Sequence, residues 1–296
     1  MTVTVDAHYV TQFSDRIHLA AQQKTSRLRP YVEVQTVQGE NMAYDGLGTV
    51  EVSEVTTRYT AVSFTDMAHK RRKLTPSTWS VTLPIDEKDV LQMLADPQPK
   101  YVDAVVNAIM RKMDDIIYTA MFASVYTGKD FGTTVTAAAD GVLTVDATGG
   151  FTYAKLLEII QNFIDNEVGN ELDVPIILGI GGEEHTDLKT EIELNSNDYD
   201  KNFEVKNGRL STVEGMSVIL FGKNSSLPII DVTDTTADCF AAAKGAICLG
   251  LAQEMQVKVQ ERTDLIQTMQ VQVNGRFGAV RTEGKLVQKV QTTRAA

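Results

Sequence analysis

The chain has 296 residues, of which 43% are hydrophobic, and a mean hydropathy of -0.12; these values are ordinary for a globular protein of one large or two modest domains. Its 39 acidic and 28 basic residues give a net charge of -11, which argues against general nucleic-acid binding because each phosphate contact requires Lys or Arg. No apolar run approaches the ~18 residues of a membrane span, and the first residues lack the features of a signal peptide.

The first 45 residues mix helical and extended signals. Phe13 and Ile17 are one helical turn apart, whereas Val32 and Val34 alternate with polar residues as in a strand. We expect an N-terminal arm that is partly helical and ordered only by its contacts.

The next segment, from Val50 to Leu83, predicts a long two-stranded β arm. Apolar residues alternate with polar ones along both limbs, at Val50, Val52, Val62 and Phe64 outward and at Trp79, Val81 and Leu83 on the return. The basic run 69–73 would form the tip. About 15 residues per limb at roughly 3.3 Å each give a reach of about 50 Å. Because an isolated ribbon is marginal in water, we expect the arm to lie on another copy of the protein, which indicates assembly rather than catalysis.

Two kinds of side chain on this arm are candidates for a subunit interface. Trp79, Val81 and Leu83 form an apolar strip that a neighbouring copy would bury. Arg71, Arg72 and Lys73 would form ion pairs with an acidic surface such as the segment 183–200 of an adjacent copy. The alternative for each charged residue is a solvated position, and exposed pairs are worth only ~0 to 1 kcal/mol.

The strongest helix signal covers residues 101–126. Apolar residues recur at three- and four-residue steps and leave one polar face, and Gly128 is a natural stop. About 25 residues at 1.5 Å give a rod of nearly 38 Å, which suits a structural spine. Asp114 and Asp115 are adjacent on this helix and point in different directions, so we interpret them as intersubunit or solvated residues rather than a general acid/base couple.

The remaining elements are shorter. Asp86 is a candidate N-cap for a short helix, residues 129–150 resemble a loop or weak hairpin, and a second helix is expected from Thr152. A buried strand at Val174–Leu178 follows, and Asn207-Gly208 favours a hairpin turn. The last 60 residues are mainly β, with strict alternation over 255–259 and 269–273.

No pattern for catalysis or for a cofactor stands out in the sequence. The run Gly179-Ile-Gly-Gly182 lies between a predicted strand and helix, but Glu183 and Glu184 place negative charge where a nucleotide phosphate would lie. The four His residues lack metal-ligand spacing, and Cys239 and Cys248 are expected to be reduced, buried thiols. We therefore expect no catalytic residues, no metal and no cofactor.

Several segments together resemble the major capsid proteins of tailed bacteriophages, which have the Hong Kong 97-type fold. One group combines Asn195–Asp200, Asn207-Gly208 and Glu214–Ile219, and it resembles the polar axial loop, turn and strand of that family. The other resembles the terminal strands of the peripheral domain and comprises Ala243–Ile247, Val257–Val259, Glu261-Arg262, Gln270–Val273, Phe277-Gly278 and Arg281. The similarity runs from about Leu83 to Val290 and rests on the order of these segments.

The resemblance implies an α+β fold with five segments. These are an N-terminal arm (1–45), an extended β loop (46–84), a peripheral domain with the spine helix 101–126 (85–150), an axial domain (151–238), and further peripheral strands with the C-terminus (239–296).

The function implied by the resemblance is that of a structural major capsid protein. Such a protein self-assembles in the host cytoplasm, as hexamers and pentamers, into an icosahedral shell that encloses double-stranded phage DNA with non-specific contacts and without a membrane. A portal and decoration proteins are further implied partners. Relatives often carry a long N-terminal scaffolding segment for which this sequence has no room, so we expect a separate scaffolding protein. Covalent cross-linking through Lys70 or Lys73 lacks a recognisable Asn or Glu partner.

Two other functions stay open at this stage. An encapsulin-like bacterial compartment would have the same architecture and enclose cargo proteins. An α/β nucleotide-binding enzyme would use the Gly179 turn.

Overall fold

The computed structural model describes residues 22–52, 54, 57, 64–85, 98–168, 174–191, 203–206, 209–222, 227, 229, 236–262 and 268–294. Several expected features lie outside these residues: the helical part of the arm before residue 22, the short helix after Asp86, the polar segment Asn195–Asp200 and the Asn207-Gly208 turn itself.

The chain divides into two compact units. Unit 1 contains Thr78–Met110 and Met255–Gly275, and unit 2 contains Ser26–Ser77, Arg111–Glu254 and Arg276–Ala296. A few long elements contribute residues to both.

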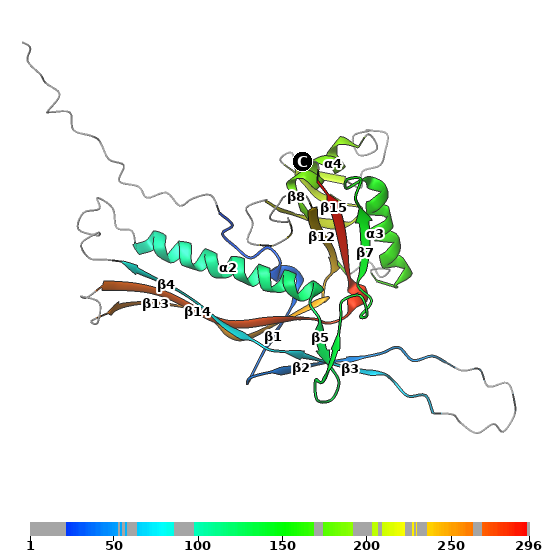
Figure 1. Ribbon diagram of the computed structural model, residues 1–296, viewed down its shortest axis with the longest axis horizontal. Coiled ribbons are helices and arrows are strands. Elements are labelled where there is room, and N and C mark those ends of the chain that lie inside the picture. The colour runs from blue at the N-terminus through cyan, green and yellow to red at the C-terminus, as the bar shows by residue number, and fades with distance from the viewer. Residues whose placement is uncertain are drawn as a thin grey trace, which may run out of the picture. The chain divides into compact units, whose positions relative to one another are not determined.

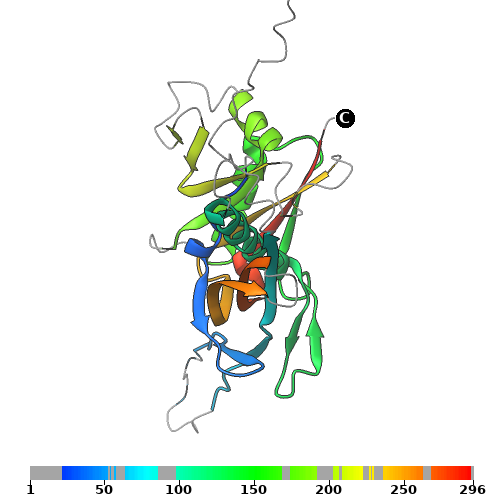
Figure 2. The same cartoon turned by 90° about the vertical axis from the view of Figure 1, so that its left-hand side faces the viewer.

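Unit 1 is built from the long strands and the first half of the spine helix (Figures 1 and 2). Strands β4 (Ser77–Ile85), β13 (Ile247–Arg262) and β14 (Thr268–Arg281) are neighbours in a sheet with the order β1-β13-β14-β4. Side chains link neighbouring strands, as where Ser80 Oγ lies 2.6 Å from Asn274 Oδ1. The strands expected over 255–259 and 269–273 are confirmed as parts of β13 and β14. The burial alternation holds over 269–273 but is wrong over 255–259, where Val257 and Val259 are each 45% exposed.

The spine helix is confirmed as α2 (Gln98–Phe122), a single helix of 25 residues. Its buried side chains follow the helical period at Val105, Ile109, Met113 and Ile117. The predicted C-terminal boundary is wrong, because Val125–Thr127 forms strand β5 instead of a last helical turn. These β-branched and aromatic residues pair with β6 (Thr133–Val135), an alternative that helical periodicity does not reveal.

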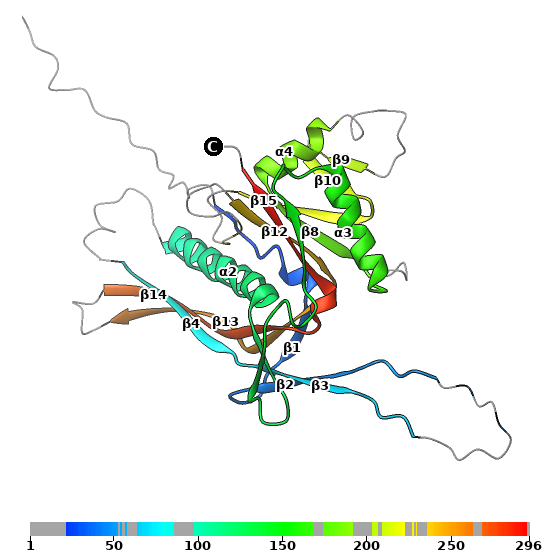
Figure 3. The ribbon, with the colours of Figure 1, turned by 45° about the vertical axis from the view of Figure 1, so that its right-hand side comes forward.

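Unit 2 is organised around a seven-stranded sheet with the order β7-β15-β12-β8-β11-β10-β9. Its strands are β7 (Leu143–Ala147), β8 (Ile176–Gly181), β9 (Phe203–Lys206), β10 (Arg209–Val213), β11 (Met216–Phe221), β12 (Thr236–Ala243) and β15 (Val287–Thr293). Helix α3 (Tyr153–Asp165) lies beside β7, and α4 (Gly182–Thr190) continues from β8 (Figure 3). The expected second helix and the β9–β10 hairpin are confirmed.

The centre of this sheet is closely packed. A Cβ at Gly179 would overlap the ring of Phe240 on the neighbouring strand β12, so only glycine fits there. Phe240 and Leu178 are fully buried. The glycines of this segment therefore serve sheet packing.

A second, four-stranded sheet of unit 2 has the order β2-β3-β5-β6. Strand β2 (Met42–Leu47) runs antiparallel to β3 (His69–Leu74), from Met42 opposite Leu74 to Leu47 opposite His69 (Figure 1). Strand β1 (Glu33–Thr36) pairs in parallel with β13, and 3-10 helices occur at Arg29–Tyr31 and Gly284–Leu286 (η4).

The predicted pairing of the β arm is wrong. The sequence predicts pairing of the limb 50–64 with 79–83, but the strands that pair are β2 and β3, while β4 belongs to the long sheet with β14. The basic run 69–73 consequently lies within β3 rather than at a tip. The Thr75-Pro76 corner separates β3 from β4. The alternating apolar residues of β4 are therefore part of the long sheet, where they are half-buried.

None of the described helices is long and apolar enough to span a bilayer.

Gly278 of β14 offers a test of the corner that separates β3 from β4. A Cβ at this position would lie 2.6 Å from Thr75 O and 3.0 Å from Pro76 Cα, both backbone atoms that cannot move alone. Gly278→Ala is expected to destabilise the unassembled protein by ~1–3 kcal/mol in urea unfolding. Gly132→Ala, where nothing lies within 4 Å, serves as the control. Equal unfolding curves for the two variants would contradict this packing.

Candidate assembly interface

The segment joining β2 and β3 exposes several large apolar side chains. Val52 is 98% and Phe64 96% exposed, and Leu47 at the start of the segment is 68% exposed. Met67 and Val50 are also exposed. A loop with this many exposed apolar groups indicates a surface that another molecule covers.

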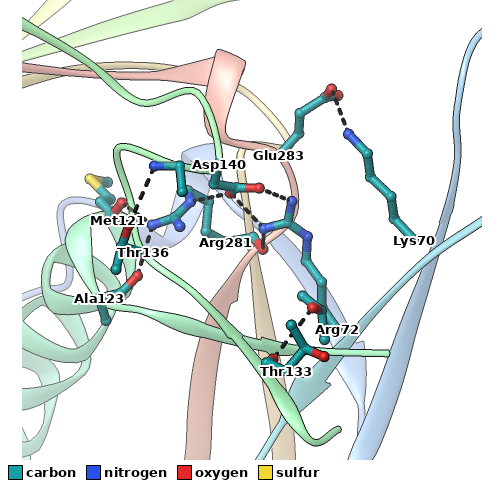
Figure 4. Close-up of polar contacts among 11 residues, drawn as sticks. Lys70, Arg72, Met121, Ala123, Thr133, Thr136, Asp140, Arg281 and Glu283 are labelled. Carbon is teal, nitrogen blue, oxygen red and sulfur yellow. Dashed lines mark hydrogen bonds and ion pairs between the residues drawn. The ribbon is translucent and has the colours of Figure 1, made fainter. Parts of the chain in front are cut away.

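The root of this loop is held by an ionic cluster centred on Asp140 (Figure 4). Arg72 on β3 donates from Nη2 to Asp140 Oδ1 at 2.6 Å and from Nη1 to Asp140 Oδ2 at 2.8 Å. Arg281 at the end of β14 donates from Nε to the same Oδ2, also at 2.8 Å. One carboxylate therefore joins two strands that are distant in sequence.

The same cluster reaches the end of the spine helix. Arg281 Nη1 donates to the carbonyl oxygens of Met121 at 2.7 Å and Ala123 at 3.0 Å. Arg72 Nη1 donates to the carbonyl of Arg281 itself at 3.1 Å. The loop root, the end of α2 and the end of β14 are thus fixed to one another within unit 2.

Burial makes this cluster energetically important. Arg72 is 2% exposed and Arg281 fully buried. Burial by itself raises the pKa of the Asp140 carboxyl, but the hydrogen bonds and charges of Arg72 and Arg281 outweigh it, so the pKa lies below the ordinary value of 3.8. Removing one member of a buried ion pair leaves an uncompensated charge, which is strongly destabilising.

The three basic candidates from the sequence occupy different environments. Arg72 was predicted to pair with an adjacent subunit, and this is wrong, because its guanidinium is buried against Asp140 of its own chain. Arg71 lies on the opposite face of β3 and forms an exposed ion pair with Asp45 on β2 at 2.6 Å. Lys73 is half-buried. Strand alternation separates these neighbours, so the basic run is not one charged surface.

The two acidic candidates on α2 also differ. Asp114 was interpreted as intersubunit or solvated, and this is wrong, because it is 0% exposed. It accepts hydrogen bonds from Ser26 Oγ at 2.5 Å and from the backbone N–H groups of Arg27 at 2.9 Å and Leu28 at 3.2 Å. Asp115 is half-buried and pairs with Lys112 one turn earlier.

Asp114 therefore fixes the segment that leads into the N-terminal arm. Next to it, the Arg27 side chain donates to the Leu220 carbonyl on β11 and its guanidinium lies 5.5 Å from the centre of the Phe221 ring. The arm is thus attached to both the spine helix and the seven-stranded sheet of unit 2.

The apolar candidates Trp79, Val81 and Leu83 lie on one face of β4. All three are half-buried, whereas the alternating residues Ser80, Thr82 and Pro84 are exposed. The strip is therefore partly covered within the chain itself.

The glycine run packs against a buried ion pair. Glu184 and Arg294 form a buried ion pair at 2.7 Å, and a Cβ at Gly181 would overlap both side chains. Cys239 and Cys248 are buried free thiols, as expected, and burial raises the pKa of Cys248 to about 12. Among the described residues, no group of three His, Cys, Asp or Glu side chains could hold a metal ion.

Comparison with known proteins identifies the class. A sequence profile of a family described as phage capsid protein matches residues 5–293, so the chain belongs to this family. None of the curated protein sequences is significantly similar to the chain.

Solved capsid structures share the fold at low sequence identity. The capsid protein of cyanophage P-SCSP1u is 11% identical, with a TM-score of 0.76 over 100% of this chain and 96% of that one. That of Helicobacter pylori bacteriophage KHP30 is 10% identical, with a TM-score of 0.76 over 99% and 98%. Cyanophage Pam1 gives 15% identity and a TM-score of 0.71 over 98% of each chain.

The solved structures confirm the Hong Kong 97-type fold, and the family match confirms the capsid function. The protein is a structural subunit of the phage virion that associates with itself in the capsid shell, and it is not an enzyme. Neither the encapsulin-like compartment nor the nucleotide-binding enzyme is favoured.

Asp140→Asn tests the loop root. The substitution keeps the shape but leaves two buried arginines without a counter-charge, so we expect a loss of ~3–5 kcal/mol in urea unfolding of the unassembled protein at neutral pH. Asp45→Asn, at the exposed pair with Arg71, should have a small effect.

The loss of unfolding free energy caused by Asp140→Asn should become smaller as the pH falls. Because the folded-state pKa is lowered, the carboxylate contributes stability above its ordinary value of 3.8, and this contribution is lost as the pH falls through the lowered folded pKa. The wild-type protein and Asp140→Asn should therefore converge in strongly acidic solution. A difference that stays constant across this range would contradict the assignment.

Asp114→Ala tests the attachment of the arm. Without the carboxylate, the hydrogen bonds that fix residues 26–28 are lost, so trypsin should cleave the Arg27–Leu28 bond at least several times faster. Mass spectrometry of the fragments measures this rate, and Asp115→Ala on the same helix is the control. Unchanged cleavage at Arg27 would show that the arm is held by other contacts.

Proposed function

We propose that this protein is the repeating subunit of an icosahedral head shell that encloses double-stranded phage DNA. Hexamers and pentamers would form in the host cytoplasm, each copy covering the extended loop of another. The observation that carries the proposal is the near-complete exposure of Val52 and Phe64, which gain stability only when a second molecule buries them.

Burial of apolar side chains is proposed to contribute most of the free energy of association between copies. Fully burying one Val or Phe side chain is worth ~1.5–3 kcal/mol, whereas an exposed ion pair is worth ~0–1 kcal/mol. The remaining exposed parts of Trp79, Val81 and Leu83 are proposed to add to the covered surface. Arg71, Lys73 and Asp115 are proposed to form its polar rim.

Each segment of the chain is proposed to have its own role in the shell. Segments 1–45 and 46–84 would reach neighbouring copies, and 85–150 would supply the rigid spine. Segment 151–238 would form the axial domain at the local symmetry axis, with its sheet completed by β7, β12 and β15. The rest of 239–296 would extend the peripheral sheet of β13 and β14.

We also propose partners outside the shell itself. A separate scaffolding protein would set the curvature, a portal would occupy one vertex, and decoration proteins would bind the finished surface. Because 39 acidic residues outnumber 28 basic ones, the chain as a whole repels phosphate, so DNA would be contacted weakly and non-specifically.

The double variant Val52→Ser, Phe64→Ser tests the loop as the adhesive element. Since both side chains are exposed in the single chain, the thermal midpoint of the unassembled protein should be unchanged. The fraction of protein sedimenting as particles should fall at least tenfold, because two apolar contacts are lost at every copy. Thr65→Ala on the same loop is the control. Normal particle yield in the double variant would refute the proposed role of the loop.

A further inference from the structure

A cavity of about 340 Å³ lies at the root of the extended loop. Its walls come from β2, β3 and the turn after β14, and they include Lys70, Arg72, Glu283 and Lys285. Gly46 and Gly48 form part of the wall and contribute no side chains. The cavity therefore opens beside the surface through which the loop is proposed to meet other copies.

The charge of this cavity is opposite to that of the protein. Three basic residues and one acidic residue line it, on a chain whose net charge is -11. Glu283 lies 3.8 Å from Lys70, a long contact between two half-exposed side chains that neutralises only part of this charge. Lys285 is exposed and forms no ion pair with any residue that the structure describes. The cavity thus has a net positive charge.

Arg72, one of the residues that line the cavity, has a side-chain donor without a partner in the described part of the chain. The Nη atoms of Arg72 are occupied by Asp140 and by the Arg281 carbonyl. Its Nε–H is buried and has no acceptor among the described residues. A buried donor without an acceptor is costly, and a carboxylate oxygen is the acceptor that a guanidinium prefers.

We propose that this cavity receives an Asp or Glu side chain of a second copy of the protein in the shell. The inference rests on the proposed assembly and names its electrostatic contact. With 39 acidic and 28 basic residues per copy, contact between copies places like charges together unless basic sites receive acidic side chains. Glu51, Glu54 and Asp66, exposed on the loop, are examples of acidic groups that a neighbouring copy can offer.

Zero-length cross-linking of assembled particles identifies the occupant. Particles are assembled from equal amounts of ¹⁴N- and ¹⁵N-labelled protein and treated with a carbodiimide, which joins a Lys amine directly to a carboxylate in contact with it. We expect peptides that join Lys285 or Lys70 to an acidic residue and contain one light and one heavy partner. Lys155 and Glu158, 2.8 Å apart on α3, provide the control, because their cross-link should never mix isotopes.

The outcomes separate this inference from the proposed function. If no particles form, both fail. Particles in which the Lys285 and Lys70 cross-links are absent, or contain only one isotope, would overturn the inference and leave the shell function intact. If inorganic phosphate raises the thermal midpoint of the unassembled protein through these lysines and mixed cross-links are absent, the cavity binds a free anion and the second-copy proposal is overturned.

A pair of lysine variants provides an independent measurement. Lys285→Ala and Lys244→Ala each remove one exposed positive charge, but Lys244 lies in the turn between β12 and β13, outside the cavity. Only Lys285→Ala should lower the NaCl concentration at which particles dissociate, by at least twofold. Equal dissociation of the two variants would contradict the proposal.

Discussion

The geometry of the loop root in unit 2 depends on a single carboxylate shared by two buried arginines. Asp140 bridges Arg72 on β3 and Arg281 on β14, and Arg281 extends the contact to the end of α2. Such a cluster is a poor source of net stability, because desolvation offsets most of the attraction. The cluster instead gives geometric specificity. Planar guanidinium groups bind a carboxylate in only a narrow range of geometries, so the position of the loop root is fixed.

A fixed loop root favours the proposed role of the exposed loop in assembly. An unrestrained loop would lose conformational entropy when it bound another copy, and this loss would oppose assembly. With β2 and β3 paired and Arg72 buried, the root of the loop is already fixed in the single chain. The burial of side chains such as Val52 and Phe64 can then contribute directly to association.

The sequence predicted the elements whose periodicity is regular. The spine helix, α3 and β14 follow from spacing, because each buries one continuous face. Spacing also identified β13 as a strand, although its residues from 256 onward are exposed. The arm pairing failed because alternation identifies strands but not their partners, and β4 had an equally good partner in β14. Arg72 and Asp114 were misplaced for a similar reason: a charged residue appears solvent-facing until its distant partner is known. Asp140 lies in a segment that the sequence predicts as a loop or weak hairpin, and no sequence pattern marks it as part of a buried cluster. Arg281 was noted only through the family resemblance.

The central claim is that the extended loop is incomplete until a second copy covers it. A cryo-electron microscopy map of the assembled particle tests this most directly, at a resolution that shows side chains. The account predicts that Val52 and Phe64 are buried against a neighbouring copy, while Arg72, Asp140 and Arg281 keep the contacts that they have in the single chain. A particle in which both apolar side chains face solvent would contradict it.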